Sequence, residues 1–178
     1  MTKILFLDLD GTVRRTKSGT TFINTPLDQE IIPGVKEALA RYPNHYIIGI
    51  TNQGGVAAGK KSLHSAITEQ KYTMQLLPQL SKVYFCPDFD GRQCQRLTFT
   101  DNIIRCAETD FEEQDLQQWQ GKCRKPNPGM VEIAIAEMSL KVSRQECLFV
   151  GDRPEDQACA LAANIPFMWA ADWRGECD

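Results

Sequence analysis

Two aspartates, Asp8 and Asp10, end one of the most apolar runs of the chain, in the stretch ILFLDLDGTV. Alternate side chains of a β-strand share a face, so both carboxylates would point the same way. A buried carboxylate without a partner costs free energy, and two neighbouring carboxylates repel each other. A positive charge must therefore lie against them.

These residue types suit phosphoryl transfer. Asp8 can act as a nucleophile that forms an acyl phosphate, and Asp10 can protonate the leaving oxygen and then activate water. A magnesium ion would relieve the repulsion between the carboxylates and neutralise the incoming phosphate. The alternative is a strand that ends in an ordinary Asp-Gly turn, which does not explain two aspartates on one face.

Three further polar clusters carry groups that this chemistry needs. Thr51 and Asn52, in GITNQGG, offer a hydroxyl and an amide, although a helix-entry loop would look the same. Lys125, in CRKPNPGM, is either a point charge for a phosphate or the aspartates, or a surface lysine. Asp152 and Asp156, in VGDRPEDQ, add oxygen ligands that suit magnesium, or cap the next helix.

A competing pattern runs from Gly54 to Lys60, where GGVAAGK matches the phosphate-loop spacing G-x-x-x-x-G-K. The next residue should be Ser or Thr to hold magnesium, but it is Lys61. A nucleotide-binding kinase is therefore an alternative, in which nothing explains the paired aspartates.

The elements that must position these clusters are short apolar runs alternating with helical patterns. This alternation predicts an α/β fold, a Rossmann-like three-layer α/β/α arrangement around a mostly parallel sheet. Ligands of such sheets bind at the carboxyl ends of the strands, where the clusters would meet. The expected strands are 3–7, 45–50, 82–85, 147–150 and 166–169, and the expected helices are roughly 34–42, 62–80, 128–138 and 154–163.

The segment 87–121 interrupts the alternation. It is polar, with at most one short helix expected near 111–119. We therefore expect an irregular insert after the third strand, of the kind that is usually functional, a small subdomain or disordered.

Composition narrows the class of protein. The 178 residues suit one domain, 1–178, and the net charge of −3 provides no general basic surface for nucleic acid. No apolar run approaches the length of a membrane span, and no signal peptide precedes the first strand. Seven cysteines, an odd number, argue against a disulfide framework. These features predict a cytoplasmic protein.

The order of the motifs resembles that of the haloacid-dehalogenase-like (HAD) phosphohydrolase superfamily, from Lys3 to about Ile165. LDLDGTV, TNQGGVAAGK, CRKPNPGM and VGDRPEDQACALAANIP are similar to the subgroup of histidinol-phosphate and heptose-bisphosphate phosphatases. The phosphatase part of polynucleotide kinase-phosphatases is a more distant relative.

The resemblance implies roles for matching residues. Asp8 would be the nucleophile and Asp10 the general acid and base. Thr51, with Asn52 beside it, would bind the transferring phosphoryl group, and Lys125 would neutralise its charge.

The resemblance also implies a magnesium site. The ion would be held by Asp8, the backbone carbonyl of Asp10, and Asp152. Asp156 would lie behind these ligands or replace one of them.

Relatives often carry a zinc loop with a Cys-x-His pair and a Cys-x-Cys pair. Here Cys86 and Cys123 match the outer positions, while an aspartate and a glycine replace the inner ones. Cys94 and Cys106 lie in the same insert and could complete a four-sulfur zinc site. Four free thiols are the alternative.

The sequence thus predicts a magnesium-dependent phosphomonoesterase with no large cap domain, acting on a sugar phosphate, histidinol phosphate or a similar small ester. The insert would then determine most of the substrate specificity. A polynucleotide 3′-phosphate is an alternative substrate, against which the acidic net charge argues. A phosphate-loop kinase and a catalytically silent binding domain are two further hypotheses.

Overall fold

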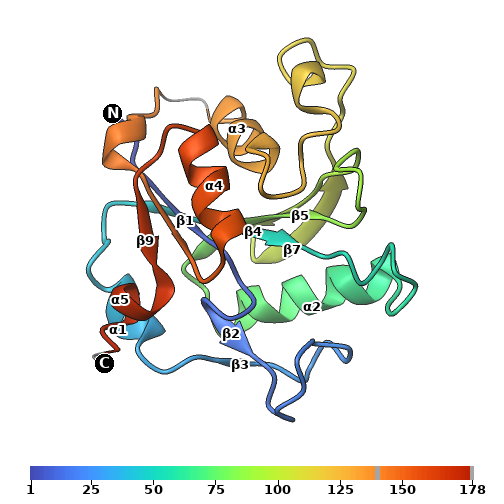
Figure 1. The fold of residues 1–178 in the computed structure, drawn as a ribbon, viewed down its shortest axis with the longest axis vertical. Coiled ribbons are helices and arrows are strands. Elements are labelled where there is room, and N and C mark those ends of the chain that lie inside the picture. Colours follow the sequence, from blue (N-terminus) through green and yellow to red (C-terminus); the bar gives the residue numbers. More distant parts are fainter. Residues whose placement is uncertain (139–140, 177–178) are drawn as a thin grey trace.

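A seven-stranded sheet forms the centre of the molecule, in the order β7-β6-β5-β4-β1-β8-β9 (Figure 1). The computed structural model describes residues 1–138 and 141–176, so that Cys177 lies outside the described residues. The five strands from β5 to β9 in this order run parallel, and β6 and β7 are antiparallel. The strands are β1 (Ile4–Leu7), β4 (Tyr46–Asn52), β5 (Leu80–Cys86), β6 (Gln95–Thr100), β7 (Ile103–Glu108), β8 (Leu148–Gly151) and β9 (Phe167–Trp169).

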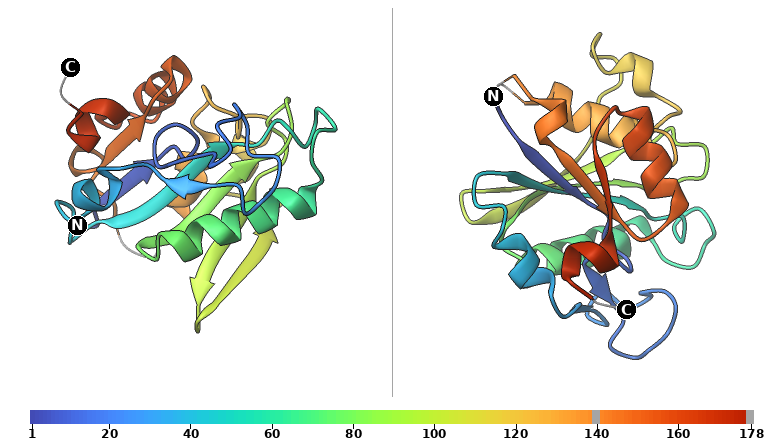
Figure 2. Two further views of the ribbon diagram at one scale, coloured as in Figure 1. Left: turned by 90° about the horizontal axis from the view of Figure 1, so that it is seen from below. Right: turned by 60° about the vertical axis from the view of Figure 1, so that its left-hand side comes forward.

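Helices cover both faces of the sheet. On one face α1, α2 and α5 pack on a core that includes Leu5, Leu7 and Val83. On the other face α3 and α4 pack on a core that includes Phe6 and Ile50. Figures 1 and 2 show α2 on one side of the sheet and α3 and α4 on the other. The helices are α1 (Val35–Leu39), α2 (Leu63–Leu76), α3 (Gly129–Ala136), α4 (Pro154–Ala162) and α5 (Ala170–Arg174), with 3-10 turns η1 (Gln117–Trp119) and η2 (Arg144–Glu146).

The predicted α/β fold is confirmed: β1, β4 and β8 lie between two helical layers and are largely apolar runs, whereas the edge strand β9 is partly exposed. The second predicted strand ends two residues later than expected. β4 continues to Asn52, so that Thr51 and Asn52 end the strand rather than follow it.

The prediction of an irregular insert was wrong for its middle part. There β6 and β7 form a hairpin that pairs with β5 and extends the sheet by two antiparallel strands. The hairpin projects from the body of the molecule at this edge (Figure 2, left). Asp101 and Asn102 make its turn with φ angles of 52° and 61°, the positive values that a two-residue hairpin turn requires. This Asp-Asn pair between alternating residues was the sequence signal for the hairpin.

A second, two-stranded ribbon lies beside the sheet. It pairs β2 (Arg14–Arg15) with β3 (Glu30–Ile31), and the loop between them spans residues 16–29. Among the described residues, no helix is both long enough and apolar enough to cross a membrane.

Candidate active site

Lys125 supplies the positive charge that the paired aspartates require. Asp8 follows β1 directly and is 6% exposed, and Lys125, before α3, is 5% exposed. The Lys125 ammonium donates to Asp8 Oδ1 at 2.6 Å, to Asp156 Oδ1 at 2.6 Å and to the carbonyl of Ile50 at 3.1 Å. All three donors of the ammonium therefore have an acceptor.

This arrangement changes the pKa values of its members. Burial raises the pKa of Asp8 to about 7, against the lowering effect of Lys125. Burial alone would lower the pKa of Lys125, but Asp8 and Asp156 raise it above its ordinary value. Lys125 thus stays charged, whereas a cation near Asp8 would favour the carboxylate form of that residue.

Asp8, Asp152 and Asp156 each offer an oxygen within 4.8 Å of the other two. Asp152 follows β8 and is exposed, and Asp156 lies in the first turn of α4. The second oxygen of Asp156 accepts the backbone N–H groups of Asp152, at 3.2 Å, and Arg153, at 3.0 Å. Asp156 thus fixes both Lys125 and the start of α4, and Asp8 and Asp152 are left as the more open carboxylates.

Close packing fixes the position of this carboxylate cluster. A Cβ added to Gly151 would lie 2.3 Å from Cβ of Asp156. One added to Gly11, where φ is +88°, would lie 2.3 Å from Oδ2 of Asp152. Both glycines therefore allow the backbone to approach the acids.

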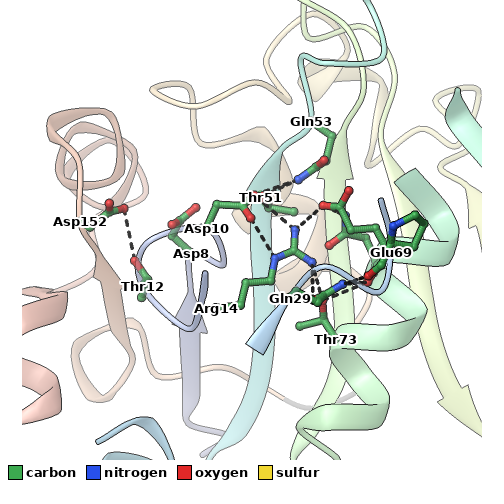
Figure 3. A network of polar contacts seen from close by, with 12 residues as sticks. Asp8, Asp10, Thr12, Arg14, Gln29, Thr51, Gln53, Glu69, Thr73 and Asp152 are labelled. Atoms are coloured by element: carbon green, nitrogen blue, oxygen red, sulfur yellow. Dashed lines mark hydrogen bonds and ion pairs between the residues drawn. The ribbon is translucent and has the colours of Figure 1, made fainter. Parts of the chain in front are cut away.

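Asp10 is held from one side by a guanidinium. Arg14 Nε donates to Asp10 Oδ1 at 2.9 Å, and Nη2 donates to Oδ2 at 3.2 Å. Gln53 Nε2 donates to Oδ2 at 3.1 Å (Figure 3). Burial alone would raise the pKa of Asp10, but Arg14 outweighs it and holds this pKa below its ordinary value.

Thr51 and Asn52 differ in what they contact. The buried Thr51 hydroxyl accepts from Gln53 Nε2 at 3.1 Å and lies 3.5 Å from Asp10 Oδ2. The Asn52 carboxamide exchanges two hydrogen bonds with the backbone of Lys125, at 3.0 and 3.1 Å. Asn52 therefore fixes the lysine loop, a role that was not expected from the sequence.

These groups open into a cleft of about 1010 Å³. In addition to Arg14, Lys61 and Lys125, four further basic residues line the cleft: Arg15, Lys60, Arg124 and Arg153. Two exposed aromatic rings also line the cleft: Phe22, 64% exposed, and Phe89, over which Arg124 lies at 5.3 Å.

The insert reaches the cleft through its first residues and not through its hairpin, since Phe89 is its contribution to the lining. Arg124 lines the cleft from just beyond the other end of the insert. Much of the lining comes instead from the loop that follows β2, for which the sequence had suggested no role. The loop residues are Thr16, Thr20, Thr21, Phe22, Ile23 and Asn24.

Four residues around Asp10 were not expected from the sequence: Arg14, Gln53, Lys61 and Glu69. Glu69 occupies a core-facing position of α2, with Ala66 and Thr73 one turn to either side, and is 1% exposed. A charged residue in a helical stripe that faces the core was the signal that could have identified it.

The predicted four-sulfur zinc site is wrong in at least one ligand. Cys86, Cys94 and Cys123 are fully buried in the core under α3, whereas Cys106 packs against the opposite core. Cys106 faces the other side of the sheet because it pairs with Leu97, which belongs to that core. Burial raises the pKa of Cys86 to about 12, so that its thiol is neutral. Among the described histidines, cysteines and acids, only the aspartate cluster above gathers three potential metal ligands.

The sheet order and the acids at the ends of β1 and β8 define a HAD-like phosphatase. The family model described as polynucleotide kinase 3 phosphatase matches residues 3–167, and the chain belongs to this family.

The chain is similar to D-glycero-D-manno-heptose-1,7-bisphosphate 7-phosphatase of Chlorobaculum tepidum, with 29% identity over 175 residues, 92% of this chain and 75% of the relative. The D-glycero-beta-D-manno-heptose-1,7-bisphosphate 7-phosphatase of Photorhabdus laumondii is 26% identical, over 90% of this chain and 76% of its own length.

Solved structures share the fold. A HAD-like phosphatase from Mesorhizobium loti superposes with a TM-score of 0.66 at 23% identity, covering 92% of this chain and 69% of that one. D,D-heptose 1,7-bisphosphate phosphatase from B. bronchiseptica, complexed with magnesium and phosphate, gives 0.62 at 22% identity, covering 94% and 79%.

Proposed function

We propose that this phosphatase is a magnesium-dependent phosphomonoesterase that hydrolyses a small ester of the sugar-phosphate type through an aspartyl phosphate. The observation that carries the proposal is the pairing of Asp8 with Lys125 beside Asp152 and Asp156. The relatives named as heptose-bisphosphate phosphatases support the substrate class.

The reaction takes two steps. An oxygen of Asp8 attacks phosphorus, the bond from phosphorus to the leaving oxygen breaks, and that oxygen takes a proton from the protonated form of Asp10. Because Arg14 lowers the pKa of Asp10, this protonated form is the minor one. Water then attacks the acyl phosphate and gives a proton to Asp10, which releases inorganic phosphate and restores the Asp8 carboxylate. Lys125 and the Thr51 hydroxyl bind and orient the phosphoryl oxygens.

The oxygen donors of the acid cluster suit magnesium. Asp8, the backbone carbonyl of Asp10, and Asp152 would hold the ion, with Asp156 behind them. When bound, it supplies positive charge that neutralises the phosphate. The magnesium and phosphate bound to the B. bronchiseptica enzyme support this assignment.

A polynucleotide 3′-phosphate is a second candidate substrate. The exposed rings of Phe22 and Phe89 at the cleft could stack bases, and the basic side chains around them could contact phosphates. The description of the matching family model is consistent with such a substrate.

We further propose that the protein works in the cytoplasm. The six cysteines of the described residues are all free, as is typical of proteins in a reducing compartment.

The test is phosphate release from sugar phosphates, histidinol phosphate and a 3′-phosphorylated oligonucleotide, with and without magnesium. We expect magnesium-dependent release that Asp8→Asn lowers by at least about a thousandfold. The control, Asp172→Asn, changes an exposed carboxylate on α5 and should leave the rate unchanged.

The preferred ester separates the two candidates. A sugar phosphate as the fastest substrate supports the first. A faster oligonucleotide, with a rate that falls steeply as salt rises, supports the second. No release from any ester, together with ATP binding that Lys60→Ala abolishes, would replace both with the kinase alternative.

A further inference from the structure

Asp10 belongs to a closed ring of five side chains, and Figure 3 labels four of them: Asp10, Arg14, Gln53 and Glu69. Arg14 joins Asp10 to Glu69, with Nη2 donating to Glu69 Oε1 at 2.7 Å. Lys61 Nζ joins Glu69 Oε2, at 2.5 Å, to Gln53 Oε1, at 3.1 Å. Gln53 Nε2 returns to Asp10 Oδ2 at 3.1 Å and closes the ring. Two carboxylates, two cations and one amide alternate so that the ring carries no net charge.

The ring is buried except where Asp10 meets the cleft. The side chains of Arg14 and Glu69 are 0% and 1% exposed, that of Lys61 is 8% exposed, and that of Asp10 is 39% exposed. Removing one member of such a buried charge pair leaves its partner uncompensated, so the members are strongly interdependent.

Arg14 has no freedom to turn away from Asp10. Its two remaining N–H groups, on Nη1, reach Gln29 Oε1 at 3.3 Å and the Thr73 hydroxyl. All five guanidinium donors therefore have acceptors, and three of these acceptors, including Glu69, come from outside the Asp10 turn.

The position of Asp10 in the chain explains why it needs such support. β1 ends at Leu7, so Asp10 lies in a turn and not on a strand. A reacting carboxyl on a turn holds one orientation only when neighbouring side chains fix it. The ring reaches Asp10 from β2, the end of β4 and α2, and the rigid sheet and helix thereby fix the turn.

We infer that Arg14, Glu69 and Lys61 are positioning residues that hold the Asp10 carboxyl against the leaving oxygen of the substrate. Lys61, which replaces the Ser or Thr of a phosphate loop, holds Glu69 and Gln53 in place. The inference rests on the proposed function, because it concerns the proton that Asp10 transfers in the first step.

The test compares two esters with different needs for that proton. An alkoxide leaving group must be protonated as it departs, whereas p-nitrophenolate departs without help. The measured quantity is kcat/KM for an alkyl phosphate and for p-nitrophenyl phosphate, because it reports the steps up to departure of the leaving group.

We expect Glu69→Gln to lower kcat/KM about ten- to a hundredfold for the alkyl ester and far less for the aryl ester. The matched control is Glu132→Gln, which removes a carboxylate of α3 that lies outside the ring. Both oxygens of Glu132 pair with Arg144, at 2.7 Å. Glu132→Gln should leave the ratio of the two kcat/KM values unchanged. Lys61→Gln provides a second route to the same result if Glu69→Gln folds poorly.

A double-mutant cycle distinguishes positioning from a general structural role. In an Asp10→Asn background, Glu69→Gln should no longer change the ratio, since the carboxyl that it positions is absent. Equal losses for both esters, or an unchanged ratio in both Glu69→Gln and Lys61→Gln, would overturn the inference while leaving the phosphatase proposal intact. If the wild-type protein hydrolysed neither ester, both this inference and the phosphatase proposal would be overturned.

Discussion

Two of the cations at the base of the cleft are each paired with two carboxylates. Lys125 is shared by Asp8 and Asp156, and Arg14 is shared by Asp10 and Glu69. The two aspartates of the DLDGT sequence thus have separate cations. Because the two cations lie on separate elements, the environments of Asp8 and of Asp10 can differ although only one residue separates them.

Asp156 is expected to affect magnesium binding through its ion pair with Lys125. In Asp156→Asn the side chain keeps its size but loses the ion pair with Lys125. We expect the magnesium concentration for half-maximal phosphate release to rise about ten- to a hundredfold, as is typical when a partner of metal ligands is changed. A magnesium titration of the initial rate measures this.

The control for Asp156→Asn is Glu155→Gln, one residue earlier on α4 and exposed. It should change the half-maximal concentration by less than about twofold. Equal effects of the two substitutions would mean that Asp156 contributes only to the general negative charge of the cleft.

At the scale of elements, the hairpin β6–β7 is attached to the sheet without taking part in the cleft. Leu97 of β6 is fully buried in the core that includes α2, whereas Phe99, two residues on, is 50% exposed. The hairpin is therefore anchored at its base and more exposed toward its tip.

This difference in burial along β6 predicts that replacing its side chains by alanine will lower the stability of the protein by different amounts. Leu97→Ala should lower the free energy of unfolding by about 2–4 kcal/mol, from lost burial and the cavity left behind. Phe99→Ala, the control on the same strand, should cost less than about 1 kcal/mol. Urea denaturation measures both, and similar losses would show that the hairpin packs uniformly.

The sequence predicted those elements whose signals are local. The parallel strands are apolar runs, and acids or Thr51 end three of them, so that their meeting at one edge follows from topology alone. The Lys125 motif pointed to the same site. The ring around Asp10 was not predictable in this way, because Arg14 and Glu69 are 55 residues apart and each has an ordinary surface alternative. The hairpin was not predicted because its strands contain many polar residues. The face of the sheet on which Cys106 lies could therefore not be predicted either, since it follows from the pairing within that hairpin.

The whole molecule concentrates negative charge at one point. Among the described residues, Asp8, Asp152 and Asp156 form the one group of three potential metal ligands. The folded state holds these three carboxylates close together although they repel each other. A cation that binds there favours the folded over the unfolded chain, which has no such site.

Magnesium should therefore stabilise the protein against heat. At a concentration a hundred times Kd the gain is about 2.7 kcal/mol, which raises Tm by roughly 5–10 °C for a chain of this size. Differential scanning fluorimetry measures the shift, which Asp152→Asn should abolish and Asp115→Asn, an exposed change in the insert, should keep. A shift that survives in Asp152→Asn would place the ion elsewhere.

The separation of Lys125 from its partner Asp8, 117 residues along the chain, has a consequence for how the protein is made. During synthesis Asp8 and Asp10 leave the ribosome long before Lys125, which pairs with Asp8, and Asp152 follows later still. No partly synthesised chain that stops short of these residues can contain the site. Activity should therefore appear in a single step, after all of these segments have been synthesised. Its appearance during translation would report that the strands of the sheet have assembled.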